Sequence, residues 1–122
     1  MIIVDSSVWI DHLRKTEPAL QQLVETLQLR IHPFVLAEIA LGNPPNRTRL
    51  LRNLSLLIEA PVASNDEVIV LVERQAIFGQ GIGFVDVHLL ASARLLPGGK
   101  IWTRDNRLRA AAARLGLAAE FD

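Results

Sequence analysis

Hydrophobic residues occur along this chain in two patterns, short continuous runs and longer segments with helical spacing. The short runs predict buried strands, which we expect at 2–4, 29–32, 57–62, 101–103 and 118–121. Apolar residues three or four positions apart predict helices between them, at 18–27, 34–41, 50–57, 65–77, 84–96 and 108–115, with a further helix after Asp5. Strands that alternate with helices favour parallel pairing through right-handed crossovers, so the pattern predicts an α/β sandwich.

The composition indicates an ordinary globular protein. The 122 residues are half hydrophobic and 21% charged, which fits a single domain over 1–122. The lack of cysteine excludes disulfides, thiolate catalysis and cysteine–zinc sites and is consistent with the cytoplasm. No apolar stretch approaches the roughly 20 residues that a membrane span needs, and the first residues do not resemble a signal peptide. We therefore expect a cytoplasmic protein with no membrane partner. The net charge of zero does not by itself indicate nucleic-acid binding.

Four acidic residues stand at positions where an α/β fold places its chemistry. Asp5 follows the first predicted strand directly, and Asp105 follows the strand at 101–103. Asp86 lies in the first turn of a predicted helix, and Glu38 interrupts an apolar helix. Ligands of open α/β sheets bind beyond the carboxyl ends of the strands, so we expect these side chains to converge there.

Each acid alone also has an ordinary structural explanation. Asp5 and Asp105 suit helix caps, Asp86 suits a helix N-terminus, and Glu38 could face solvent. Together they indicate a metal site, because clustered carboxylates repel one another and need a cation. All-oxygen ligands without cysteine or paired histidines favour Mg²⁺, or Mn²⁺ in its place, over zinc. One ion and two ions both remain open.

Other residues with chemical potential receive structural interpretations. His12, His32 and His88 are not spaced as a metal-binding pair, so we expect packing or solvent-facing roles. The glycines at 79, 81 and 83 follow a helix and lack a Gly-Lys-Ser/Thr sequence. They therefore predict a turn that leads into the helix of Asp86 and not a nucleotide-binding loop.

Four segments resemble the motifs of PIN-domain nucleases, in particular the VapC toxins of type II toxin–antitoxin pairs. The first is Ile-Ile-Val-Asp-Ser-Ser-Val-Trp-Ile-Asp at 2–11, and the second is Leu-Ala-Glu-Ile-Ala-Leu-Gly at 36–42. The third and most distinctive is Gly-Ile-Gly-Phe-Val-Asp-Val-His-Leu-Leu-Ala-Ser-Ala at 81–93. The fourth is Ile-Trp-Thr-Arg-Asp-Asn-Arg-Leu at 101–108. Their order and spacing are similar to the family pattern over nearly the whole chain.

The resemblance implies a three-layer α/β/α sandwich with a parallel five-stranded sheet ordered 3-2-1-4-5. It implies endoribonuclease activity that depends on Mg²⁺, and inhibition by a cognate VapB-like antitoxin. It also implies a homodimer that binds operator DNA only through the antitoxin. By this resemblance, the catalytic and metal-binding residues are Asp5, Glu38, Asp86 and Asp105. Further residues with expected roles are Ser7 and Thr103, which support the site by hydrogen bonding, and Arg104 and Arg107, whose positions suggest contacts with the RNA backbone.

Two positions depart from the family pattern. His32 precedes Pro33 where serine or threonine is expected, and Asn106 follows Asp105 where a further acid is frequent. The missing acid makes a second metal ion less secure.

Two alternative functions and one surface hypothesis follow from the same sequence. A PIN-like module that binds RNA or protein without catalysis is disfavoured by the four intact acids. A phosphoryl-transfer regulator needs a lysine after a late strand, whereas Lys100 precedes its strand. The leucine-rich segments 20–27 and 50–57 exceed the needs of a small core, so part of their surface is a candidate dimer seam or antitoxin groove.

Overall fold

The computed structural model describes the whole chain from Met1 to Asp122, which folds into three strands and seven helices. The strands are β1 (Ile2–Val4), β2 (Leu29–Arg30) and β3 (Lys100–Trp102). The helices are α1 (Ser6–Arg14), α2 (Pro18–Glu25), α3 (Pro33–Leu41), α4 (Arg47–Ser55), α5 (Asn65–Arg74), α6 (Phe84–Leu95) and α7 (Asn106–Arg114). None of these helices combines the length and apolar character that a membrane crossing requires.

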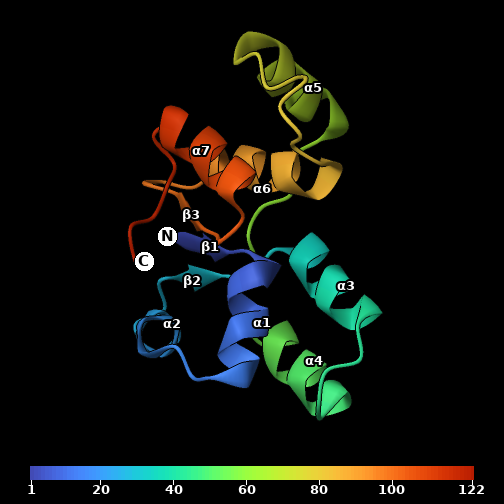
Figure 1. Ribbon diagram of the computed structural model, residues 1–122, viewed down its shortest axis with the longest axis vertical. Coiled ribbons are helices and arrows are strands. Elements are labelled where there is room, and N and C mark those ends of the chain that lie inside the picture. Colours follow the sequence, from blue (N-terminus) through green and yellow to red (C-terminus); the bar gives the residue numbers. More distant parts are fainter.

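The three strands form a parallel sheet in the order β2-β1-β3. Ile2 pairs with Leu29 on one side and with Lys100 on the other, and the register continues to Val4 opposite Trp102. Helices α1 to α4 lie toward the β2 end of the sheet, and α6 and α7 lie toward the β3 end, with α5 packed outside α6 (Figure 1). Because all strands run the same way, the segments that follow β1 and β3 leave the sheet at the same edge.

The sheet has three strands and not the five that the sequence predicted. The predicted outer strands are each reduced to one parallel bridge, Ile31 with Glu59 and Ile101 with Ala118. These bridges lie on the outer sides of β2 and β3, where the expected order 3-2-1-4-5 places its edge strands. At the first edge the pairing stops after Ala60 donates to Ile31. The next donor on the β2 side would be residue 33, which is a proline without an N–H and begins α3.

Helix α6 is the centre of the core. Its residues from Val87 to Ala93 are all buried, as expected for a helix that is covered on every side. It contacts β1, β3 and α5, and full burial of a side chain such as Leu89 or Leu90 stabilises the fold by about 1.5–3 kcal/mol. The first turn of α6 lies at the edge of this buried zone and carries Asp86.

The leucines of α2 and α4 mainly serve the core. Leu20, Leu23 and Leu54 are buried, so most of the apolar surface that suggested a partner seam on these helices is already covered by the protein. Leu27 and Leu56 are the exposed exceptions. The expectation that part of this surface is a dimer seam or antitoxin groove stays a prediction, which now concerns the leucines that remain exposed.

Candidate active site

The ends of β1 and β3 bring the first acid together with two hydroxyl groups. The backbone N–H of Asp5 donates to the Trp102 carbonyl at 2.9 Å, which extends the strand pairing by one step. The Asp5 carboxylate is only 5% exposed. Its Oδ2 accepts hydrogen bonds from Ser7 Oγ and Thr103 Oγ1, each at 2.8 Å. Asp5 is thus a buried carboxylate held in one orientation by the two residues expected to support it.

Asp105 follows Thr103 and caps α7. Its backbone N–H donates to Thr103 Oγ1 at 3.1 Å. Its Oδ1 accepts from the backbone N–H groups of Arg107 at 2.9 Å and Leu108 at 3.0 Å. The capping interpretation is therefore right for this residue, and it leaves Oδ2 of the exposed Asp105 without a hydrogen bond inside the protein. Capping and a role in the site are compatible, because they use different oxygens.

Glu38 and Asp86 approach from two helices. Asp86 is half-buried in the first turn of α6, and its Oδ2 accepts from the Gly83 N–H at 3.4 Å. Glu38 lies on the exposed side of α3, where its Oε1 accepts from Ser6 Oγ at 3.4 Å. Ser6 directly follows Asp5, so this contact places α3 beside the end of β1.

The four carboxylates share one electrostatic environment. Partial burial and the negative charges of Asp5 and Asp86 raise the pKa of Glu38 above its ordinary value. Partial burial and the charges of Asp5 and Asp105 likewise raise the pKa of Asp86. Each helix acid therefore responds to the strand-end acids, and we call these four residues the acid cluster. Their repulsion disfavours the fully charged state unless a cation lies between them.

The acid cluster does not already have the geometry of a closed metal cage. No three acidic or histidine side chains in the protein are grouped as a ready set of metal ligands. The oxygens of Asp5, Asp86 and Asp105 are instead partly engaged by hydroxyl and backbone donors. The structure thus brings the four predicted acids into electrostatic contact, and their role as metal ligands stays a prediction.

The two arginines expected to contact RNA differ in their availability. Arg104 pairs with Asp11, Glu17 and Asp122 at 2.8, 2.8 and 3.1 Å, so its guanidinium is occupied by three carboxylates. Arg107 is exposed and forms no ion pair in the protein. Its side chain lies against Gly81, where an added Cβ would be 2.6 Å from the Arg107 Nη1. Arg107 is therefore the arginine that is free at the site.

The hydrogen bonding of the buried His32, beside the site, was not predicted. His32 is fully buried, and its Nδ1 accepts the Phe34 N–H at 3.0 Å, which caps α3. Its Nε2 lies 3.0 Å from Ser92 Oγ on α6. Because Nδ1 accepts, the neutral ring carries its hydrogen on Nε2 and donates to Ser92. The sequence signal for this capping role was the departure from the family pattern at this position, where a histidine before proline replaces the expected serine or threonine.

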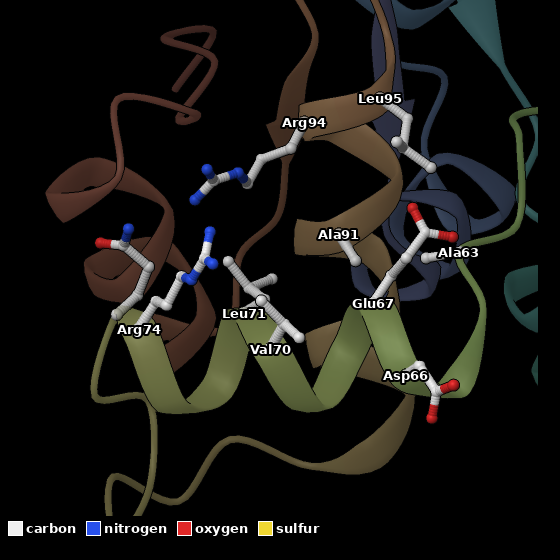
Figure 2. A pocket seen from close by; sticks show the side chains of 10 residues that line it. Ala63, Asp66, Glu67, Val70, Leu71, Arg74, Ala91, Arg94 and Leu95 are labelled. Atoms are coloured by element: carbon white, nitrogen blue, oxygen red, sulfur yellow. The ribbon is translucent and has the colours of Figure 1, made fainter.

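A separate hollow of about 350 Å³ lies between α5 and α6. Leu71, Ala91 and Leu95 contribute apolar surface to it. Figure 2 shows Arg74 and Arg94 turned toward each other at one end, and Asp66 and Glu67 at the other end. This surface has an apolar centre and opposite charges at its two ends.

A parallel α/β sheet with acids from four separate segments at its carboxyl edge defines a class of protein that includes metal-dependent hydrolases. The sequence profile of the PIN domain matches residues 2–114. The chain therefore belongs to the PIN domain family, as its motifs predicted. It is also 45% identical over 118 residues to Ribonuclease VapC32 of Mycobacterium tuberculosis, in strains CDC 1551 / Oshkosh and ATCC 25618 / H37Rv. Each match covers 97% of this chain and 95% of the relative.

Proposed function

We propose that the protein is the toxin of a VapBC-type toxin–antitoxin pair and cleaves RNA as a metal-dependent endoribonuclease. The observation that carries this proposal is the arrangement of acids at the sheet edge, where hydroxyl groups fix Asp5 and Ser6 joins Glu38 to the end of β1. The effect of these acids on one another's pKa supports it. The name of the relatives, Ribonuclease VapC32, supports the same activity, because the similarity extends over nearly the whole of both chains.

The donor set of the acid cluster fits Mg²⁺, with Mn²⁺ as a substitute. Asp5, Glu38, Asp86 and Asp105 offer only oxygen ligands, which hard divalent cations prefer. The pKa values of Glu38 and Asp86 are raised mainly by burial and further by repulsion from the neighbouring acids, and a nearby cation would offset that repulsion. When bound, such a cation lowers the pKa of a coordinated water and neutralises charge on a phosphate.

The residues around the acid cluster hold it in place and orient the substrate. Ser7 and Thr103 fix the Asp5 carboxylate through hydrogen bonds to the same oxygen, so its other oxygen faces the site. Arg107 supplies a free guanidinium two residues after Asp105, where it pairs with a backbone phosphate of the RNA. We assign this contact to Arg107 and not to Arg104, because three carboxylates already occupy Arg104.

The same proposal includes a homodimer, a VapB-like antitoxin as inhibitor, and contact with operator DNA only through that antitoxin. The hollow between α5 and α6 suits a second copy of the chain. A twofold axis would place Arg74 and Arg94 of one copy opposite Asp66 and Glu67 of the other, and would cover exposed apolar residues such as Val70. Light scattering of the charge reversal Arg74→Glu tests this: we expect a monomer, and a dimer that persists unchanged would remove this surface as the interface.

The test of activity is cleavage of single-stranded RNA by the purified protein. We expect cleavage with Mg²⁺, none with EDTA, and none for Asp86→Asn, whose fold should persist because the substitution removes a repelled charge. Glu25→Gln is the control, since Glu25 is an exposed carboxylate at the end of α2 that lies outside both the acid cluster and the proposed dimer surface. Tight RNA binding without cleavage by the wild type would instead favour the non-catalytic PIN-like module.

A further inference from the structure

An aromatic cluster lies where α3 and α6 meet, and we define it as Phe34, Phe84 and His88. The rings of Phe34 and Phe84 are stacked, with centroids 6.0 Å apart and an angle of 23° between their planes. The His88 ring meets both edge-on, at 4.8 Å from Phe34 and 4.6 Å from Phe84. Phe84 and His88 are four residues apart on α6, so they lie on one face of that helix.

The cluster is buried on one side and open on the other. His88 is 3% exposed and forms its base, whereas Phe84 is 63% exposed. Exposure alone says little, because single apolar residues are common on protein surfaces. Phe78 is also 63% exposed. Phe84 differs because a second ring supports it from behind, which holds it as a rigid flat surface.

The aromatic cluster borders the acid cluster through α3. Phe34 precedes Glu38 by four residues on α3, which is about one helical turn on the same face. Phe84 shares the first turn of α6 with Asp86 but faces a different way, and its ring reaches the α3 side by stacking on Phe34. The charges of Glu38 and Asp86 are close enough to affect each other. An open aromatic surface therefore lies beside Glu38, on the α3 side of the carboxylates that we assign to phosphate chemistry.

We propose that the aromatic cluster stacks an unpaired base of the RNA substrate, from a nucleotide next to the phosphate held at the acid cluster. This inference rests on the proposed function, and it adds a base-binding subsite to it. A base is joined to its phosphate by one sugar, so a base contact must lie close to the phosphate site. Exposed aromatic rings that stack bases are a general means of single-strand recognition.

Stacking on these rings favours a base over a charged group. The stacked rings of Phe34 and Phe84 carry no charge and present a flat apolar face. Any of the four bases has a face that can stack, and such a contact is therefore tolerant of sequence. The cluster accordingly contributes affinity for one unpaired nucleotide more than it selects a particular base.

The test compares Phe84→Ala with the matched control Phe78→Ala on a short single-stranded RNA with one cleaved bond. A series of the same RNA with one abasic nucleotide at each position near that bond identifies the stacked base. For the wild type, we expect one abasic position to raise KM by about 5- to 150-fold. Phe84→Ala should raise KM for the intact RNA similarly, with kcat nearly unchanged, and should lose sensitivity to that abasic position. Phe84→Trp should restore both the wild-type KM and the sensitivity to that abasic position.

The outcomes separate this inference from the proposed function. Fluorescence anisotropy with the same RNA in EDTA measures binding without cleavage, so stacking is tested even if the protein cuts nothing. Equal affinities of Phe84→Ala and Phe78→Ala for this RNA, or the same abasic penalty in Phe84→Ala as in the wild type, would overturn the stacking surface. A change from dimer to monomer in Phe84→Ala by light scattering, with RNA affinity intact, would show a contact between copies instead.

Discussion

The buried pair of His32 and Ser92 makes a specific prediction about stability in acid. His32 caps α3 by accepting at Nδ1 and bonds Ser92 through Nε2. The capping contact needs the neutral ring, because a protonated Nδ1 cannot accept a hydrogen bond. Burial, with a smaller effect of His88, lowers the pKa of His32 from 6.5 to about 4. Between these two pH values, His32 therefore stays unprotonated in the folded protein and becomes protonated in the unfolded chain. Stability from this residue is complete above pH 6.5 and is lost as the pH falls toward 4.

The size of this loss of stability follows from the shift in the pKa of His32. One pKa unit corresponds to about 1.4 kcal/mol, so the change from 6.5 to about 4 corresponds to about 3 kcal/mol of unfolding free energy. In a domain of this size, this is a decrease in Tm of roughly 10 °C. The raised pKa values of Glu38 and Asp86 act in the opposite direction, since protonation of these acids relieves their repulsion on acidification.

The variant His32→Asn isolates the contribution of the histidine. Asparagine can still cap α3 through its side-chain oxygen, but it does not titrate. We expect urea unfolding to show a lower stability than the wild type at pH 7.5 and a difference that narrows by about 3 kcal/mol at pH 4. A difference that stays constant between these pH values would refute the argument that His32 is neutral and resists protonation in the fold.

Four further substitutions test other parts of the structure. Thr103→Val removes the hydroxyl that holds the buried acid, and we expect a loss of about 1–3 kcal/mol in urea unfolding together with slower RNA cleavage. Ser64→Ala breaks the capping box of α5 and should cost about 1 kcal/mol in the same assay, without an effect on cleavage. Gly81→Ala and Gly98→Ala both place a side chain at positive φ and should each cost about 1 kcal/mol or more. Only Gly81→Ala displaces Arg107 and should also weaken RNA binding, measured by anisotropy.

The central parts of the fold could be predicted because their sequence signals are local. The run before Asp5 and the run at 101–103 predicted β1 and β3, and Ser64 with Glu67 forms the capping box that begins α5. The edge strands could not be predicted with the same success. Their pairing depends on contacts with β2 and β3, and the start of α3 at Pro33 limits one of them to a single bridge.

The candidate site was predictable in its residues but not in its hydrogen bonding. The positions of Asp5 and Asp105 at strand ends follow from the apolar runs before them. That Arg104 is engaged by three acids could not be read from the sequence, because Asp11, Glu17 and Asp122 are far from it along the chain. The aromatic cluster also forms only when α3 and α6 pack together, so no local pattern indicates it.

The most direct test of the account is a titration of the protein with Mn²⁺, followed by electron paramagnetic resonance, without RNA. The acid cluster should bind the ion in the wild type and in the control Glu25→Gln, and binding should weaken strongly in Asp5→Asn and Asp86→Asn. Both of these variants should remain folded by circular dichroism. Equal Mn²⁺ binding by all four proteins would contradict the claim that these carboxylates form one metal site.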